Sequence, residues 1–291
     1  MQNLEVVTLM NKFKIISFLR RICPPILLDY LLTKLVKIHF LFFPKKILKK
    51  NKILKNSAKG KVGFLLATGP SINKQDLAKL EKYDCFSLSS FFVHKDINII
   101  NPKYHFFAPY HEPLIVEDWV KWINLADKSL PKSTKIVLSV KDYKRIKDLG
   151  LLKKREITFL HFSKFIEVNN LDICGPLPDM QTHPLMVLPF MIYMGYKKIY
   201  LLGCDANNLK NYEKKIENFY NQNLEVKKGS DYPWSFGIIK ELENNLSVFK
   251  QFKRYKELSN KLNIKIINLS EGSWLDFFDK ENFDDLFENK K

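Results

Sequence analysis

The sequence feature that most constrains the fold is a short apolar run that ends in a glycine turn and leads into a helical pattern. Val62–Ala67 (VGFLLA) has the length of a strand, and Thr68-Gly69-Pro70-Ser71 follows it directly. Lys74–Leu80 then has helical spacing, with Asn73 as the expected N-cap. A strand, a glycine turn and a helix in this order open a doubly wound α/β fold.

The same alternation continues along the chain. Met186–Met194 is apolar on all sides and predicts a buried helix, whereas Leu246–Leu262 has the pattern of an amphipathic helix. Further strands are expected at residues 85–93, 104–108, 135–140, 157–160, 198–202 and 264–269. We therefore predict a single Rossmann-like, doubly wound, mostly parallel sheet. Leu209–Trp234 has little hydrophobic pattern, which is typical of a lid excursion.

The net charge of +17 is concentrated at the N-terminal end. Residues 1–61 hold 14 Lys and Arg against two acidic residues, so this segment carries +12 and the remainder only +5. We predict two parts: basic amphipathic helices with a linker at residues 1–60, and a Rossmann-like domain at 61–291 with a lid at about 209–234. Nucleic-acid binding is not expected, because the charge is not spread over the folded domain.

Apolar runs edged with Lys and Arg fill the N-terminal segment. None approaches the roughly 20 apolar residues that span a bilayer, and we find no compact secretory signal with a small-residue cleavage site. This pattern favours helices that lie on an anionic membrane surface. We expect a cytoplasmic protein, peripheral at the inner face of the membrane. The alternative is that these helices pack on the domain and their lysines are merely solvated.

Four cysteines are scattered along the chain without a C-x-x-C pair or a short His/Cys cluster. This spacing argues against a disulfide framework and a structural zinc site, and it suits a reducing cytosol.

Two loops carry candidate ligand residues. Thr68-Gly69-Pro70-Ser71 and Gly203-Cys204-Asp205 each follow an expected strand, so both belong to the carboxyl edge of the sheet. Backbone N–H groups and hydroxyls there can hold a phosphate or a ribose, and Asp205 can hold a ribose hydroxyl, a metal ion or an amine. Either loop can also be an ordinary turn, and no G-x-G-x-x-G or P-loop pattern is present. No second carboxylate stands close to Asp205 in the sequence, such as a D-x-D, so nothing supports a metal-bridged diphosphate. We expect no metal and no cofactor.

Two of the six histidines fall on loops at this edge. His111 follows an expected strand within Pro109–Pro113, and His183 precedes the buried helix within Gln181–Pro184. A histidine in such a loop can act as a base or bind phosphate. Loop histidines also occur without any function.

Several blocks together resemble a known family. Thr68-Gly69-Pro70-Ser71-Ile72 matches an x-G-P-S-[IL] opening loop, and Ser89-Ser90-Phe91-Phe92 matches a polar pair followed by aromatics. Met194–Asp205 (MGYKKIYLLGCD) matches a Gly-Tyr-Lys to Gly-x-Asp block, and Ser270–Ser273 a closing segment. The chain thus resembles the bacterial sialyltransferases of glycosyltransferase family 42 over residues 61–273. It resembles pterin-kinase-like proteins with the same opening loop more loosely.

The resemblance implies a Rossmann-like domain with a lid that binds a CMP-sugar without metal. The residues that it places at the donor nucleotide and sugar are Thr68, Gly69, Pro70, Ser71, Ser89, Ser90, Thr182, Gly203, Asp205 and Tyr212.

The chain departs from the family in places that bear on catalysis. The family has Asn where Thr68 and Ser89 stand, and small residues where His183 and Pro184 stand. Its catalytic histidine belongs to the lid region, yet no histidine follows His183 here. We therefore predict His183 as the catalytic base, with His111 as the second candidate.

These features together predict a glycosyltransferase. It would move a sugar, such as sialic acid, from a CMP-linked nucleotide donor to a lipid-linked or surface-polysaccharide acceptor. The expected partners are the nucleotide-sugar, a glycan or glycolipid acceptor and an anionic membrane, and a homo-oligomer is left open. The alternatives are a phosphotransferase or pyrophosphokinase on the same scaffold, and a non-enzymatic membrane-tethered module of polysaccharide assembly.

Overall fold

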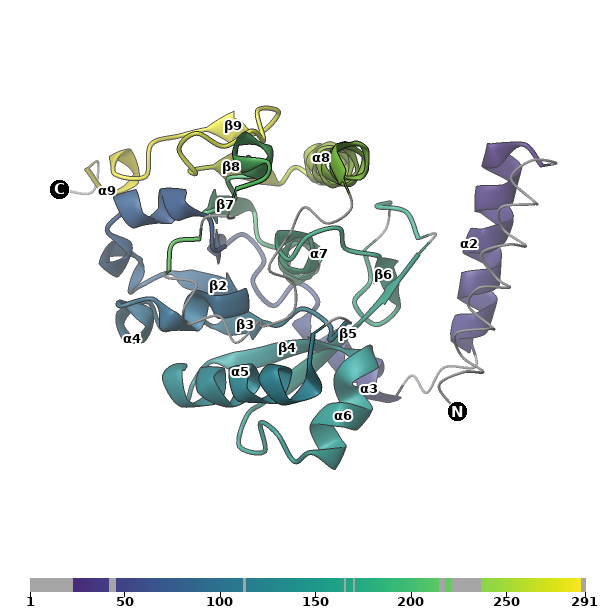
Figure 1. Cartoon of the computed structure of the whole chain (residues 1–291), viewed down its shortest axis with the longest axis horizontal. Helices are drawn as coiled ribbons and strands as arrows, with labels where there is room; N and C mark the ends of the chain where they lie inside the picture. The colour runs from purple at the N-terminus through teal and green to yellow at the C-terminus, as the bar shows by residue number, and fades with distance from the viewer. Residues whose placement is uncertain are drawn as a thin grey trace.

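The computed structural model describes residues 23–41, 46–111, 114–164, 166–169, 171–214, 218–220 and 237–288. These residues form an α/β, Rossmann-like fold around an open sheet in the order β6-β5-β4-β3-β2-β1-β7-β8-β9 (Figure 1). Every pair of neighbouring strands in that sheet is parallel. The predicted fold class is confirmed, and the sheet is parallel throughout these pairs.

The sheet contains β1 (Val62–Leu66), β2 (Asp84–Leu88), β3 (Tyr104–Phe106), β4 (Lys135–Ser139), β5 (Ile157–Ser163), β6 (Pro176–Pro178), β7 (Lys198–Leu202), β8 (Lys265–Asn268) and β9 (Asp279–Lys280). The α-helices are α2 (Pro25–Leu41), α3 (Lys46–Lys49), α4 (Ile97–Ile100), α5 (Val116–Ser129), α6 (Tyr143–Asp148), α7 (Pro184–Met194), α8 (Gly237–Lys261) and α9 (Asp285–Glu288). The short 3₁₀ helices are η1 (Lys50–Leu54), η2 (Pro70–Lys74), η3 (Leu77–Leu80), η4 (Ser89–Val93), η5 (Val140–Asp142) and η6 (Asn208–Asn211).

The order of the strands reverses at β1. The chain adds β2 to β6 one after another on one side of β1, and α7 then returns it to the other side, where β7 pairs with β1. The chain therefore continues from β1 to β2 on one side of this point and from β7 to β8 on the other. Such a switch point is where open α/β sheets bind ligands.

Two hydrophobic cores cover the two faces of the sheet. Leu65 of β1 belongs to the core that α7 and α8 cover, whereas Phe64 belongs to the core under α4 and α5. Alternation along a strand sends neighbouring side chains to opposite faces, so a central strand must be apolar on both sides. All eleven residues of α7 are buried, which explains its unbroken apolar sequence.

Some elements begin or end elsewhere than the sequence predicted. The expected strand at 85–93 stops at Leu88, because Ser89 adopts a left-handed conformation (φ +54°) and opens η4. The expected helix at 74–80 is divided into η2 and η3, and Asp76, not Asn73, caps η3 by accepting the Ala78 N–H at 3.3 Å. Hydrophobic spacing alone does not distinguish a short 3₁₀ turn from the end of a strand or helix.

The expected N-terminal linker packs against the main domain. Leu48 is fully buried, and the side-chain amide of Asn51 donates to the carbonyl oxygens of Phe159 and Ile173, both at 2.9 Å. In contrast, α2 lies to one side of the domain (Figure 1) and contacts it at the C-terminal end of the helix, where the ring of Phe40 lies 5.5 Å from that of His161 in β5. Among the described residues, no helix is long and apolar enough to cross a membrane.

Candidate functional site

The loops after β1 and β7 are joined directly above the switch point. The Ala67 N–H donates to the Leu202 carbonyl and the Gly69 N–H to the Gly203 carbonyl, both at 2.9 Å. A Cβ on Gly69 would lie 2.5 Å from the Gly203 carbonyl oxygen and 2.6 Å from the carboxyl carbon of Asp205. Glycine is required here because the two loops touch. The φ of Gly69 is −65°, so a left-handed backbone is not the reason.

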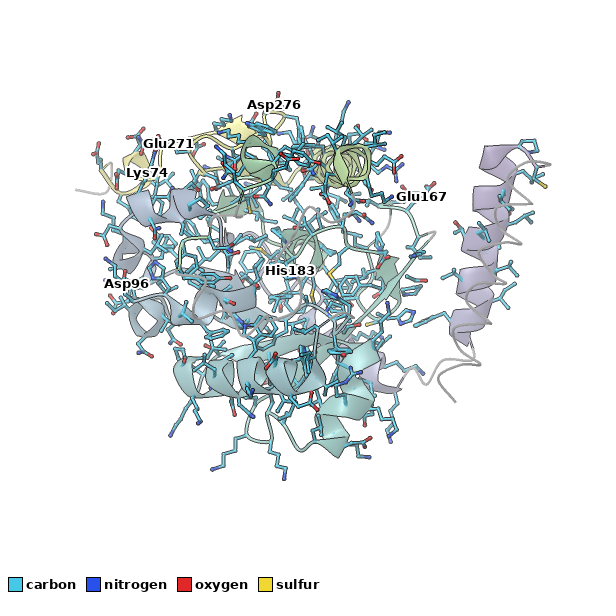
Figure 2. All side chains as sticks on the ribbon, in the orientation of Figure 1. Lys74, Asp96, Glu167, His183, Glu271 and Asp276 are labelled. Carbon is cyan, nitrogen blue, oxygen red and sulfur yellow. The ribbon has the colours of Figure 1, made fainter. Side chains whose placement is uncertain are left out.

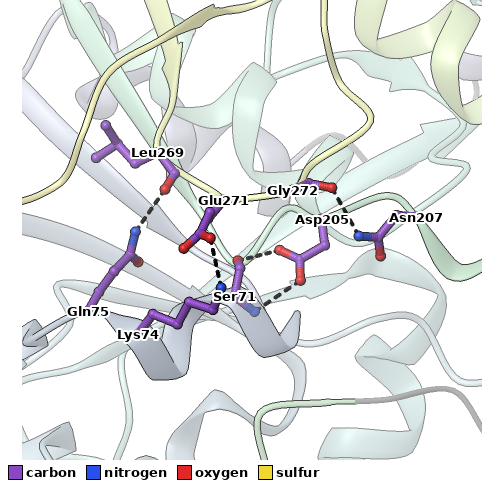
Figure 3. Close-up of polar contacts among 8 residues, drawn as sticks. All are labelled: Ser71, Lys74, Gln75, Asp205, Asn207, Leu269, Glu271 and Gly272. Atoms are coloured by element: carbon purple, nitrogen blue, oxygen red, sulfur yellow. Dashed lines mark hydrogen bonds and ion pairs between the residues drawn. The ribbon is translucent and has the colours of Figure 1, made fainter.

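Asp205 fastens these loops together. Its Oδ2 accepts the Ser71 N–H at 3.0 Å, and its Oδ1 accepts the Ser71 hydroxyl (Figure 3). Burial raises the pKa of Asp205, and the two hydrogen bonds from Ser71 oppose that shift. Since both carboxylate oxygens already accept bonds from the β1 loop, Asp205 shapes the floor of the site.

A third loop, which follows β8, supports the β7 loop from the other side. The Cys204 N–H donates to the Ser270 hydroxyl at 2.9 Å, the Ser273 hydroxyl donates to the Cys204 carbonyl at 2.8 Å, and the Trp274 N–H donates to the Asp205 carbonyl at 3.0 Å. Figure 3 also shows the Lys74–Glu271 ion pair that joins η2 to the β8 loop at 2.8 Å. These contacts fix the loop backbone before any ligand binds.

A pocket of about 300 Å³ lies above this floor, which we call the switch-point pocket. It belongs to the carboxyl edge of β1, β2 and β7 and reaches the first turn of α7 and one face of α8. Its lining residues are Ala67, Thr68, Gly69, Pro70, Leu88, Gln181, Thr182, His183, Pro184, Gly203, Cys204, Asp205, Ala206, Asn208, Asn218, Asn244, Asn245, Val248, Phe252 and Leu275.

His183 enters the pocket from the start of α7, near the middle of the molecule (Figure 2). Its backbone is in the right-handed helical region (φ −58°, ψ −41°), although a residue before proline ordinarily prefers the extended region. Pro184 takes the first helical position, where its missing N–H is tolerated. His183 is the N-cap residue, and its side chain makes no capping hydrogen bond. The positive end of the α7 dipole therefore faces the same space as the imidazole.

Helix α8 forms a wall of the switch-point pocket. Asn244, Asn245, Val248 and Phe252 line the pocket from this helix. Gln251 holds the helix in place, since its side-chain nitrogen donates to the Asp179 carbonyl at 2.7 Å and its oxygen accepts the Gln181 N–H at 3.1 Å. This wall is therefore tied to the loop that leads into α7.

Part of the predicted lid folds back over the β1 loop. The Phe219 N–H donates to the Thr68 carbonyl at 3.1 Å, and the Asn73 side chain donates to the Phe219 carbonyl at 3.2 Å. The neighbouring Asn218 lines the pocket. The rest of the predicted lid, at 215–217 and 221–234, lies outside the described residues.

Five predicted residues are not part of the pocket lining. Ser71 lies beneath it on Asp205, and Ser90 accepts the Trp122 ring N–H at 3.0 Å on the α5 side of the sheet. His111 is exposed on the loop after β3. The two others are Ser89 and Tyr212.

Ser89 instead belongs to a buried network beside the pocket. His105 donates its Nε2–H to the Ser89 carbonyl at 3.0 Å, and its Nδ1 therefore accepts the Ser87 hydroxyl at 2.8 Å. Burial lowers the pKa of His105 to about 3, so the ring is neutral at physiological pH. This network supports the left-handed backbone of Ser89, and Leu88 fills the adjoining pocket wall.

Sequence reasoning missed the amides of the pocket. They come from four separate segments: Gln181, Asn208, Asn218, Asn244 and Asn245. On α8 the sequence spacing could have revealed this face, because Asn244, Val248 and Phe252 are spaced four residues apart and so lie on one side of a helix. The other amides lie on loops, where no periodicity marks them.

No group of three or more His, Cys, Asp or Glu side chains is placed to hold a metal ion within the described part of the chain. No family model matches the sequence, and a search of curated proteins gave no match.

The fold is distantly similar to solved sialyltransferases of Campylobacter jejuni. The monofunctional α-2,3-sialyltransferase Cst-I superposes with a TM-score of 0.45 and 15% identity, over 76% of this chain and 79% of that one. The sialyltransferase CstII in complex with the substrate analogue cytidine-5'-monophosphate gives a TM-score of 0.40 and 17% identity, over 76% of this chain and 85% of that one.

Proposed function

We propose that this protein is a glycosyltransferase that uses a nucleotide-sugar donor. One observation carries the proposal: the switch-point pocket joins the β1 loop, the positive end of α7 and His183 in a single space of about 300 Å³. That volume is at the lower end of the range for small-molecule sites. A phosphate suits the helix terminus, and hydroxyls of a ribose or sugar suit the amide side chains.

The donor that we propose carries a CMP-linked acidic sugar such as sialic acid. Support comes from the opening-loop and Gly-Tyr-Lys to Gly-x-Asp blocks, which the fold brings to adjacent strands. The acceptor would be a lipid-linked or surface-polysaccharide glycan, and the protein would work at the inner face of the membrane. The exposed apolar side chains of α2, which are Leu27, Leu31, Leu35 and Ile38, support contact with lipid.

His183 would act as the base in this reaction. Its ring takes the proton of the acceptor hydroxyl while the oxygen bonds to the anomeric carbon of the sugar. The bond between that carbon and the phosphate oxygen breaks, and its electron pair leaves with the nucleotide. The α7 dipole stabilises the negative charge on the departing phosphate.

Nucleotide binding tests this proposal. We expect CMP to raise the melting temperature of the full chain in the presence of EDTA, and UMP and GMP to raise it less. Incubation with CMP-sialic acid should release CMP, and a glycan acceptor should accelerate the release. Stabilisation only by a nucleoside triphosphate with Mg²⁺ would favour the phosphotransferase, and no stabilisation by any nucleotide would favour the non-enzymatic module.

A further inference from the structure

Helix α8 carries a second exposed surface, opposite the switch-point pocket. Ile239 is 74% exposed, and Leu242 and Leu246 are each 52% exposed. At about 100° per residue, these three side chains fall on one side of the helix. Asn244, Val248 and Phe252 fall on the other side and line the pocket. Three large apolar side chains thus face solvent on the outer wall of the site.

The same side of α8 becomes basic one turn later. Lys250 and Lys253 continue the line of Leu242 and Leu246, and Arg254 lies beside them; all three are exposed. Within the described part of the chain, no carboxylate forms an ion pair with any of the three. We call Ile239, Leu242, Leu246, Lys250 and Lys253 the outer face of α8.

Acidic residues on this side of the helix are few. Glu243 is paired with Lys240 at 3.0 Å, and Glu257 follows one turn after Lys253. The outer face is therefore apolar at its start and positively charged along its second half.

We propose that the outer face of α8 docks on an anionic lipid surface. Apolar side chains that enter the headgroup region, next to cations that contact lipid phosphates, are the arrangement of an interfacial helix. An acidic glycan would bind the cations but would leave Ile239, Leu242 and Leu246 exposed to water. The charge and the apolar side chains together therefore select lipid.

The proposal has a consequence for access to the site. Because one side of α8 contacts lipid and the other lines the switch-point pocket, the pocket lies within about one helix diameter, roughly 10 Å, of the headgroups. A lipid-linked acceptor would reach it without leaving the membrane surface. The outer face of α8 shares no residue with α2 or with residues 1–22. Vesicle binding is measured without any donor, so the test of this docking surface does not depend on the proposed transferase activity.

A polarity-sensitive fluorophore on the outer face tests the proposal. The full chain with Cys23→Ser and Cys174→Ser keeps only the buried Cys85 and Cys204, and Leu242→Cys then provides the labelling site. We expect a blue shift of the emission on adding vesicles of equal parts phosphatidylglycerol and phosphatidylcholine. Ile99→Cys is the matched control, since Ile99 is similarly exposed on α4, on the opposite side of the molecule in Figure 1, and should show no shift.

Substitutions of the leucines and of the lysines measure separately how much the apolar side chains and the positive charges contribute to vesicle binding. Leu242→Glu with Leu246→Glu should weaken partitioning to these vesicles by about tenfold or more. Lys250→Glu with Lys253→Glu should weaken it by roughly fivefold for each lost cation, and added salt should remove that difference. All variants should keep the parent melting temperature, because these side chains face solvent.

The proposal is overturned if the fluorophore at Leu242→Cys keeps its emission while the protein sediments with vesicles, because the N-terminal segment would then bind alone. It is equally overturned if phosphatidylcholine vesicles give the same shift, or if the shift develops without vesicles as protein concentration rises. The last result would assign the outer face to a second copy of the chain.

Discussion

At the scale of single residues, the site depends on how closely its loops approach one another. Gly69 has an ordinary φ of −65°, yet a single added carbon would meet the Gly203 carbonyl and Asp205. A side chain at residue 69 would thus collide with other parts of the protein. From the sequence we expected a phosphate or a ribose to approach this loop instead. Substitution of Gly69 should therefore act first on the joined loops and only through them on ligand binding.

We predict that Gly69→Ala lowers the melting temperature and weakens nucleotide binding together. An added Cβ 2.5 Å from a backbone oxygen forces the β1 and β7 loops apart, and strain of this kind typically costs about 1–3 kcal/mol. Gly175→Ala is the matched control, since its Cβ would meet only the Asp172 carbonyl at 3.5 Å. A Gly69→Ala protein that melts and binds normally would show that the loops separate freely.

His183 is the second residue whose role can be measured directly. We predict that His183→Ala lowers turnover by about 10²–10⁴-fold, the usual contribution of a positioned acid or base. The melting temperature should fall much less than turnover, because the substitution removes no side-chain cap of α7.

His111→Ala is the control for this experiment, since His111 is exposed and outside the pocket lining. A normal rate for His183→Ala combined with a slow His111→Ala would transfer the role of base to His111. A normal rate for both would remove histidine from the chemistry.

At the scale of elements, the N-terminal segment divides into two parts. Residues 46–60 pack on the main domain through Leu48 and Asn51, whereas α2 exposes one apolar side and reaches the domain at its end, where Phe40 contacts His161. Removing residues 1–60 would therefore break buried contacts as well as any membrane contact. Substitutions on α2 in the full chain separate the two effects.

We predict that Leu31→Glu with Leu35→Glu reduces binding of the full chain to anionic vesicles by about tenfold or more while nucleotide binding persists. Both leucines are exposed and one turn apart, so the change should leave the domain intact. Ile53→Glu, at an exposed position on η1, is the matched control. Unchanged sedimentation with vesicles would mean that α2 does not contact lipid.

At the scale of the whole molecule, the nine parallel strands that the described residues form place the connecting loops of the site at one edge of the sheet. Loops distant in the chain meet there, and hydrogen bonds from the β8 loop to Cys204 and Asp205 hold them before a ligand binds. A preformed floor of this kind reduces the ordering cost of binding.

We predict that nucleotide binding and sugar transfer survive removal of divalent metal. The positive end of the α7 dipole would take the role that a metal ion plays at a diphosphate. Measuring the CMP-induced shift in melting temperature and the rate of transfer in EDTA and in Mg²⁺ tests this. A rate that returns only with Mg²⁺ would contradict it.

The sequence by itself determined the fold class and the two loops of the site. Apolar runs such as Val62–Ala67 and Lys198–Leu202 can be recognised as strands from the sequence alone. Parallel pairing then brings the carboxyl ends of these strands to one edge of the sheet. For the same reason Thr68 and Asp205 could be predicted to share a site. Only the tertiary structure decided that Asp205 bonds to Ser71, that Ser90 faces α5, and that amides from α8 complete the pocket. Those contacts join residues far apart in the chain, and local periodicity carries no information about which distant segment fills a given space.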